Sequence, residues 1–262
     1  MRLVGIDGNT EATFFRCLHD EVPDDPRVTK ERRRWYEAFR GKGLRAQVLI
    51  LDTEEVVGLC QYVPIEHSHL IGDDLLAILC IWVHGYDHHV GNRQGNGYGR
   101  FILESIEEDA RASGAKGVAA WGMDFEFWNP VSFYEHMGYR RVDQNGSVVL
   151  AWKPFAEDAE PPRLLRPRGS LPASTDRVDV VGCMHGWCGG GIGQCVTARE
   201  AVEGLADIVA YHEIDVSDRE TMLAVGRDSG VFVDGEPFRP AGPPYSVDDL
   251  RAEIVRRAET TP

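Results

Sequence analysis

Apolar segments of strand length alternate with segments of helical periodicity through the first part of the chain. The clearest strand is the apolar run at residues 75–83, and the clearest helix is the segment 98–112. In that helix Ile102, Ile106 and Ala110 recur at every fourth position, as the buried face of a helix requires. The whole pattern predicts strands at 2–6, 46–51, 55–62, 75–83, 117–122, 139–143 and 147–152, and helices near 9–19, 28–40, 98–112 and 130–136. The order βααβββαβαββ indicates an α+β domain.

A second pattern begins after a stretch that contains several prolines and has no periodicity. This stretch, residues 156–176, is predicted to be a linker. The chain beyond it predicts a smaller βαβαββα domain, with a hairpin turn at Asp234-Gly235 and Ser246 as the N-cap of the last helix. The predicted organisation is therefore an N-terminal domain (1–155), the linker and a C-terminal domain (177–262).

Composition limits the partners and the compartment that we expect. The 262 residues are 43% hydrophobic, which supports one large or two modest cores. A net charge of −14 argues against a nucleic-acid partner, and no apolar run reaches the length of a membrane span. The basic run from Lys30 to Arg34 is predicted to be the solvated face of a helix. No export signal follows Met1, so the six cysteines predict a reducing cytoplasm rather than a disulfide framework.

The most informative motif is the glycine-rich stretch Gln94-Gly95-Asn96-Gly97-Tyr98-Gly99, which joins the strand 75–83 to the helix 98–112. Glycines let backbone N–H groups turn inward, and a helix N-terminus adds partial positive charge, so this turn predicts a cradle for a phosphate or pyrophosphate. It lacks the Gly-Lys-Ser/Thr ending of a P-loop, and its glycines are not spaced as in a dinucleotide fold.

A second motif follows at the end of the domain. Asn129-Pro130 precedes Phe133-Tyr134-Glu135-His136-Met137-Gly138-Tyr139, where Pro130 suits the start of a helix and Gly138 its left-handed C-terminal cap. Together, Gln-x-x-Gly-x-Gly and Phe-Tyr-Glu-x-x-Gly-Tyr in this order resemble the GNAT superfamily of N-acetyltransferases. The resemblance covers roughly residues 1–155 and implies a mixed, splayed sheet flanked by helices.

The resemblance also implies an activity and its site. Such a domain transfers an acetyl group from acetyl-CoA, its cosubstrate, to an amine that attacks the thioester directly in a ternary complex. Tyr134 matches the tyrosine that protonates the departing thiolate. The residues expected to bind the cofactor are Ile81, Trp82 and Val83 for the pantetheine arm, Gln94, Gly95, Asn96, Gly97, Tyr98, Gly99 and Arg100 for the pyrophosphate, and Asn129 beside them.

The general base is less well specified by the sequence. His84 follows the strand 75–83, and the usual pKa of histidine, about 6.5, suits proton removal. Asp124 and Glu126 are alternatives that would act through a water. The other histidines of the domain, His67, His69, His88 and His89, match no zinc spacing and are predicted to be solvated loop residues.

The C-terminal domain resembles a thioredoxin fold. An acetyltransferase domain ending in Trp152-Lys153-Pro154-Phe155 and followed by such a module looks like the bacterial acetyltransferases with a YoaP-type C-terminal domain. The Cys-x-x-Cys pair of redox-active thioredoxins is absent from the sequence. Three interpretations stay open for the cysteines and the histidine between them: a reactive thiol, a soft-metal site, or incidental cysteines in a lid or docking domain (Cys183, His185, Cys188 and Cys195).

The expected partner is a small-molecule amine, with no nucleic acid and no membrane, and a homodimer is left open. The acceptor site is expected from the first two helices, the strand 75–83 and the loops 64–73 and 123–129. Two other functions remain in view: a non-catalytic sensor that binds CoA or a metal, and a thiol-handling acyltransferase that uses Cys188.

Overall fold

The chain folds into two compact units. The computed structural model describes residues 1–17, 25–126, 128–174, 176–239 and 245–260. The first unit comprises Met1–His19 and Glu37–Leu164, and the second comprises Asp20–Tyr36 and Leu165–Pro262.

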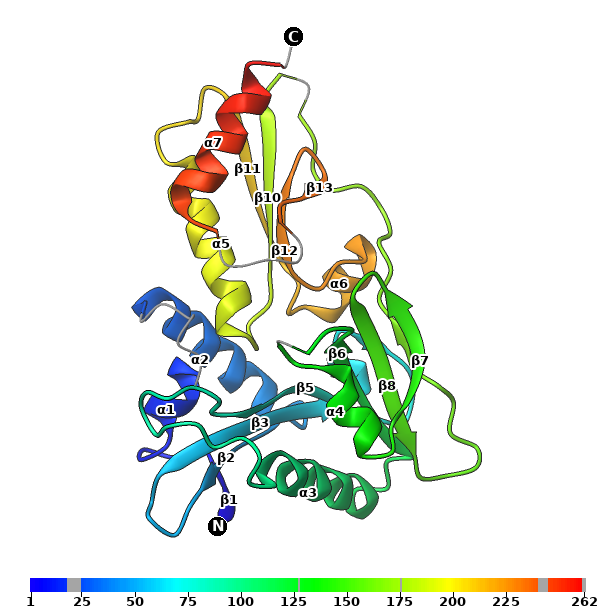
Figure 1. The fold of residues 1–262 in the computed structure, drawn as a ribbon. Coiled ribbons are helices and arrows are strands. Elements are labelled where there is room, and N and C mark those ends of the chain that lie inside the picture. Colours follow the sequence, from blue (N-terminus) through cyan, green and yellow to red (C-terminus); the bar gives the residue numbers. More distant parts are fainter. Residues whose placement is uncertain (18–24, 127, 175, 240–244, 261–262) are drawn as a thin grey trace. The chain divides into compact units, whose positions relative to one another are not determined.

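The first unit is built on a seven-stranded mixed sheet with the strand order β1-β2-β3-β5-β6-β8-β7 (Figure 1). Neighbouring strands run antiparallel except β5 and β6, which are parallel because the helix α3 crosses between them. The bounds are β1 (Arg2–Gly5), β2 (Arg45–Ile50), β3 (Val56–Pro64), β5 (Leu76–Val83), β6 (Gly117–Met123), β7 (Arg140–Asn145) and β8 (Val148–Pro154). Every strand predicted for the N-terminal domain is therefore present.

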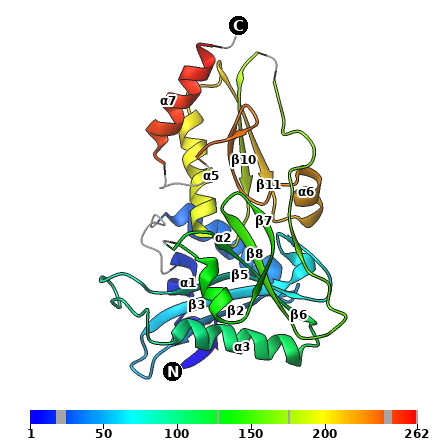
Figure 2. The same ribbon diagram turned by 45° about the vertical axis from the view of Figure 1, so that its right-hand side comes forward.

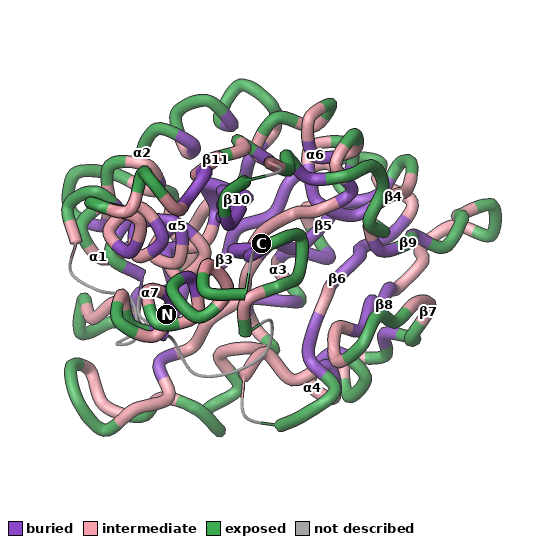
Figure 3. Tube along the Cα trace, turned by 90° about the horizontal axis from the view of Figure 1, so that it is seen from above, coloured by how far each residue is buried: buried purple, intermediate pink, exposed green. Residues whose placement is uncertain are grey.

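Two helices cover one face of this sheet. The longer is α3 (Tyr98–Ala112) and the shorter is α4 (Val131–His136), and both contribute to one core cluster with the sheet (Figures 1 and 2). The predicted stripe of Ile102, Ile106 and Ala110 is completely buried there. In Figure 3 the buried stretches follow the central strands, and the exposed ones follow the loops. Hydrophobic burial against the sheet thus fixes α3, whose first turn follows the glycine-rich loop.

The opposite face is covered by elements that the sequence pattern did not predict. They are a 3-10 turn η1 (Ile65–His67) and the short strands β4 (Leu70–Ile71) and β9 (Arg163–Leu164), which pair antiparallel. Leu70 and Leu164 are buried in a second core cluster with Ala77 and Ala119 of the sheet. Residues 163–164 of the predicted linker therefore pack on the first unit. A strand of two residues is too short to show alternating hydrophobic and polar positions, so the sequence pattern did not predict it.

The remaining helices of the N-terminal half are α1 (Glu11–Arg16) and α2 (Pro26–Arg40). The last two residues of the predicted helix 9–19 lie outside the described residues. The division between the units falls inside α2, because Val28 packs with Ile192 and Cys195 of the second unit. The sequence pattern placed all of 28–40 in the N-terminal domain. Periodicity shows which face of a helix is buried, but it does not show which part of the chain covers that face.

The buried face of α2 also carries a charge. Arg32 is only 1% exposed, so the prediction of a fully solvated basic run is wrong at this position. Lys30, Arg33 and Arg34 are exposed as predicted. Arg34 forms an ion pair with Asp215 of the second unit at 2.9 Å.

The second unit has the predicted βαβαββα order. Its four-stranded sheet has the order β11-β10-β12-β13, with β10 parallel to β11 and antiparallel to β12. The bounds are β10 (Val178–Met184), α5 (Gly189–Val202), β11 (Val209–Asp215), α6 (Arg219–Val225), β12 (Gly230–Val233), β13 (Glu236–Pro237) and α7 (Val247–Ala258). Ser246 caps α7 through a capping box with Asp249, as the sequence predicted for the N-cap.

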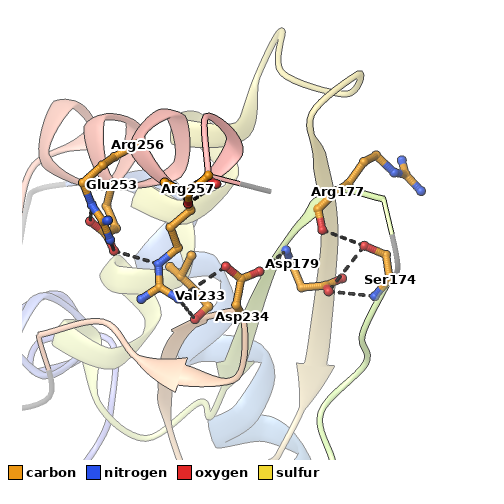
Figure 4. A network of polar contacts seen from close by, with 9 residues as sticks. Ser174, Arg177, Asp179, Val233, Asp234, Glu253, Arg256 and Arg257 are labelled. Carbon is orange, nitrogen blue, oxygen red and sulfur yellow. Dashed lines mark hydrogen bonds and ion pairs between the residues drawn. The ribbon is translucent and has the colours of Figure 1, made fainter. Parts of the chain in front are cut away.

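A polar network joins three segments of the second unit that are distant in the sequence (Figure 4). Asp234, in the left-handed conformation that the β12–β13 turn needs, accepts a hydrogen bond from the Asp179 backbone at 2.9 Å. The carboxylate of Asp179 accepts one from the Ser174 backbone at 2.7 Å. Arg257 of α7 donates to the Val233 carbonyl at 3.0 Å. The network therefore anchors the segment before β10 and the last helix to the same end of the sheet.

Among the described residues, no helix combines the length and the apolar character that crossing a bilayer requires.

Candidate acetyl-CoA site

The glycine-rich loop has the backbone of an anion cradle. Gly95 and Gly97 have φ angles of 76° and 77°, in the left-handed region that side chains with a Cβ rarely adopt. Gly97 is the N-cap of α3. Two left-handed glycines in close succession turn the chain sharply at the helix N-terminus, where unsatisfied N–H groups and the helix dipole favour an anion.

The amides of this loop are available to a ligand. The Gln94 amide donates to Asn92 Oδ1 at 2.9 Å. Within the described parts of the chain, the amides of residues 95–100 donate to no protein acceptor. The first amide of α3 with an intrachain partner is that of Phe101, which donates to the Gly97 carbonyl at 3.0 Å. Gln94 itself folds its side chain over Gly85, so it would contribute its backbone rather than its amide group.

Charge at the helix N-terminus suits a pyrophosphate. The first turn of α3 contains no acidic residue, and Arg100 is exposed there. Gly99 lies against the ring of Phe133 on α4, where a Cβ would approach the ring within 3.2 Å. A glycine at this position therefore lets the first turn of α3 pack close to the helix that carries Tyr134.

The sheet parts beside this loop. β5 and β6 pair at Leu76–Val118, Ala77–Ala119 and Ile78–Ala120, and the pairing then ends although both strands continue. β5 stays paired with β3 up to Val83, and β6 stays paired with β8 up to Met123. The facing edges of the two strands therefore separate beyond Ile78, as a splayed sheet requires.

A β-bulge lies where the strands part. The register of β5 on β3 shifts between Cys80 and Ile78, so that Leu79 is the extra residue. The Leu79 carbonyl accepts a hydrogen bond from Trp121 Nε1 of β6 at 3.1 Å. Asn129 donates from Nδ2 to the Trp121 carbonyl at 2.9 Å, so this half of its amide holds the β6 edge and is not available to a cofactor.

Tyr134 lies beside the parted strands. Its side chain is 1% exposed and packs between the rings of Phe133 and Tyr139. Burial first, and then the nearby Cys80 of β5, raise the pKa of Tyr134 above its ordinary value. The phenol therefore stays protonated at neutral pH, which is the state that a proton donor needs.

A comparison with known families identifies this domain. Residues 12–139, which include the glycine-rich loop and Tyr134, match the model of the acetyltransferase (GNAT) family. The chain contains a GNAT acetyltransferase domain. It is thus an N-acetyltransferase with acetyl-CoA as its cosubstrate. The open amides of residues 95–100 and the parted strands fit the pyrophosphate and the pantetheine arm of that molecule.

Solved structures of acetyltransferases are similar to part of this chain. A GNAT-family acetyltransferase from Staphylococcus aureus Mu50 is 10% identical, with a TM-score of 0.43, and the alignment covers 59% of this chain and 99% of that one. An acetyltransferase from Thermus thermophilus is 18% identical, with a TM-score of 0.43 and coverage of 58% and 96%. A GNAT-family acetyltransferase from Brucella melitensis, in complex with acetyl-CoA, is 17% identical, with a TM-score of 0.41 and coverage of 61% and 90%. No curated protein matches the sequence.

His84 has a structural position in the GNAT domain. Its ring is completely buried, and Nδ1 lies 3.0 Å from the Gly91 carbonyl. Its backbone accepts from the Arg93 amide at 2.8 Å, so both parts of the residue hold the loop before the cradle. It lies four positions beyond Cys80 and just past the end of β5, which is about 13 Å along an extended chain. This placement does not favour the prediction that His84 is the general base.

The two carboxylates offered as alternatives are exposed and already have partners. Asp124 forms an ion pair with Arg141 at 2.8 Å. Glu126 accepts a hydrogen bond from Ser132 at 3.2 Å. Phe127, which the sequence placed in the same loop, lies outside the described residues.

The histidines outside β5 differ in burial. His88 and His89 are exposed, as predicted, and His67 is half-buried. His69 is only 5% exposed, so the prediction of a solvated residue is wrong for it. Its ring contacts Trp121 edge-on at a centroid distance of 5.9 Å. The only sequence signal for this burial is the apolar Leu70-Ile71 that follows.

The cysteines of the second unit do not form the metal site that the sequence left open. In the parts of the chain that the structure describes, no group of three or more His, Cys, Asp or Glu side chains could hold a metal ion. Cys183 and Cys195 are completely buried, and burial raises their pKa values to about 11 and about 12. Cys188 is half-buried as the N-cap of α5, and His185 stacks on Trp187 at 3.5 Å.

Thiol titration should separate these cysteines. The thiolate is the reactive form, and a raised pKa keeps a thiol protonated at pH 8. We expect Cys60, Cys183 and Cys195 to resist a disulfide reagent in the native protein, since burial also raises the pKa of Cys60 to about 12. Cys188 should react first, and Cys188→Ser should remove the fastest phase. Fast reaction of the variant would contradict this assignment, and urea should expose all six thiols in a control.

Proposed function

We propose that the chain transfers the acetyl group of acetyl-CoA to the amine of a small molecule, by direct attack in a ternary complex. The observation that carries this proposal is the end of β5–β6 pairing at Ile78–Ala120, beside a cradle whose amides are open. Beyond Ile78 the edge of β5 no longer pairs with β6, so an extended ligand could add along it as along an edge strand.

Each part of the cofactor has a counterpart in this arrangement. The pantetheine arm would add to β5 along Ile81, Trp82 and Val83. The pyrophosphate would bind the amides from residue 94 through Arg100, of which the Gln94 amide would first have to leave Asn92. The thioester would then lie near the bulge at Leu79, next to the Cys80–Tyr134 pair.

Tyr134 would act on the leaving group. When the amine nitrogen forms its bond to the thioester carbonyl carbon, the carbon–sulfur bond breaks and negative charge develops on sulfur. A buried phenol stabilises that charge by donating a hydrogen bond and supplies the proton for the free thiol. Because the pKa of Tyr134 is raised, the donor is present throughout the neutral range.

The acceptor site would suit an amine joined to an apolar body. Phe125 is 40% exposed in the loop after β6, and Trp128 packs on Trp121 at 5.6 Å. Carboxylates at Asp124 and Glu126 lie in the same loop. An aromatic surface bordered by acidic groups favours a cationic amine with an apolar or flat substituent.

We infer that the second unit is a thioredoxin-like module of the YoaP type without redox activity. Its support is the βαβαββα order with parallel β10–β11 and antiparallel β10–β12. Its cysteines do not have the Cys-x-x-Cys spacing, and the segment before Val231 lacks the proline that precedes this strand in redox-active members. The lack of disulfides among its described cysteines fits a cytoplasmic protein.

Turnover across an amine panel tests the function. CoA release would be followed as free thiol, with aliphatic, aromatic and polyamine acceptors at a fixed acetyl-CoA concentration, and CoA binding would be measured by calorimetry. We expect CoA to bind and thiol release to depend on the amine, with apolar-substituted amines preferred. CoA binding with no turnover on any amine would favour a non-catalytic sensor, and no CoA binding would refute the proposed function.

A further inference from the structure

The segment between η1 and β4 holds a buried histidine in a fixed position. His69 lies between η1 and β4, and the residues on either side of it are anchored: Ser68 Oγ donates to the Ile65 carbonyl at 2.8 Å, and Leu70 pairs with Leu164 of β9. Leu164 is held in turn by its amide, which donates to Asp143 Oδ2 at 2.8 Å. A histidine in such a frame has little freedom to move, unlike one in a solvated loop.

A short chain of contacts connects this histidine to the bulge. The ring of His69 packs edge-on against Trp121, and the indole of Trp121 donates to the Leu79 carbonyl at 3.1 Å. Leu79 is the residue at which β5 leaves β6, and Tyr134 belongs to the core cluster that contains the adjacent Ile78 and its partner Ala120. His69 and Tyr134 therefore approach the same point of the parted sheet.

His69 and Tyr134 lie on opposite faces of the first sheet. Tyr134 belongs to the core cluster that contains α3, with Ile78 and Ala120. The elements that frame His69 belong to the other cluster, with Ala77 and Ala119, whose side chains point the other way from those of their neighbours in the strands. A thioester lying in the gap would thus have a proton donor on one side and an imidazole on the other.

We propose that His69 is the proton acceptor of the reaction. It takes a proton from the ammonium form of the acceptor, directly or through one water, and the free amine then attacks the carbonyl carbon. The nitrogen–carbon bond forms, the carbon–sulfur bond breaks, and the thiolate takes a proton from Tyr134. The nitrogen, now bonded to the carbonyl carbon, loses its second proton to solvent, and solvent returns a proton to Tyr134. The sum is an ammonium ion and acetyl-CoA giving an N-acetylamine, CoA and one proton, which both residues exchange with solvent. This inference rests on the proposed function.

The titratable groups on the described elements next to His69 differ from it in exposure. The titratable or charged residues on the elements packed around it are Glu66 and His67 on η1 and Arg163 on β9, while β4 and the adjacent Trp121 carry none. Glu66 and Arg163 are exposed, and His67 is half-buried. His67 is therefore a matched control. It is also a histidine and lies two residues away, but it is only half-buried.

Nuclear magnetic resonance tests the placement without an acceptor. The imidazole signal of His69 is assigned by its loss in His69→Asn, and that of His67 by its loss in His67→Asn. Adding acetyl-CoA and then CoA should shift the His69 signal and alter its titration, while the His67 signal changes little. An unchanged His69 signal in a protein that binds CoA would overturn the proposal.

Kinetics tests the role, using the best amine of the panel. General base catalysis contributes about 10²–10⁴-fold, so His69→Asn should lower kcat about a hundredfold or more with CoA affinity unchanged. The acidic limb of the kcat/KM profile that reports deprotonation of this imidazole should disappear, and added imidazole should partly restore His69→Ala. His67→Asn should keep the wild-type profile. A wild-type profile in His69→Asn refutes this inference alone, whereas a wild-type protein that neither binds CoA nor turns over refutes the proposed function as well.

Discussion

Tyr134→Phe is expected to lower kcat about a hundredfold or more while leaving the affinity for CoA unchanged. The variant keeps the ring that packs between Phe133 and Tyr139 and loses only the hydroxyl. A proton donor that acts on the leaving group contributes in the transition state and not in cofactor binding, so the effect should appear in kcat. Timed thiol release and calorimetry with CoA would measure the two quantities.

Tyr139→Phe is the matched control for this experiment. Tyr139 is also buried, and its ring lies 5.7 Å from that of Tyr134. Its phenol belongs to the core and should affect stability rather than turnover. If Tyr134→Phe turned over at the wild-type rate, or if Tyr139→Phe lost as much, the assignment of the acid would be wrong.

The pH dependence of kcat follows from the raised pKa of Tyr134. Burial raises the pKa of Tyr134 above 10, so the phenol is protonated below pH 10 and loses its proton only at higher pH. We therefore expect no alkaline loss of kcat from this group below pH 10. The same direction applies to folding: the unfolded chain releases this proton first, so the contribution of Tyr134 to stability declines above pH 10.

Gly97→Asp is expected to weaken CoA binding about a hundredfold without unfolding the domain. Asp tolerates the left-handed conformation better than most residues, and at the N-cap of α3 its carboxylate can accept from the same amides that are open to a ligand. It also places a negative charge near the pyrophosphate. At about 6 Å and an effective dielectric of about 20, one such pair costs about 3 kcal/mol, or about a hundredfold in affinity.

Two control variants separate the effect of the negative charge in Gly97→Asp from the effects of side-chain shape and of position in the loop. Gly97→Asn has the same shape without the charge and should weaken binding by about tenfold or less. Gly91→Asp introduces the same charge at another left-handed glycine (φ of 73°), before the cradle, and should change the affinity little. Calorimetry gives the affinities, and thermal unfolding should show all three variants folded. Equal losses in Gly97→Asp and Gly91→Asp would mean that the cradle does not bind the pyrophosphate.

The elements of the first sheet were predictable because their burial is strongly patterned. The run Leu76–Val83 and the stripe of Ile102, Ile106 and Ala110 on α3 lie where the periodicity placed them. The turn glycines were equally readable, since only residues without a Cβ readily adopt the φ angles that Gly95 and Gly97 have. Elements of two residues, such as β4 and β9, are too short to show any period.

The candidate site was predictable only in part. The loop and Tyr134 were found because each belongs to a local motif, and the structure adds that the amides are open and the phenol is buried. The general base has no local motif. His84 was chosen for its position in the sequence, yet its ring holds the loop before the cradle. His69 gained its position from β9, a partner about ninety residues further along the chain.

The sequence by itself determined the order of the strands and helices, the chemistry of the glycine-rich turn and the presence of Tyr134, because these depend on neighbours within a few residues. Only the tertiary structure decided where β5 separates from β6, which face each side chain approaches, and how the chain divides into two units. The physical reason is that burial and pairing against distant segments, such as Val28 on α5 and Leu70 on β9, are set by the folded chain as a whole.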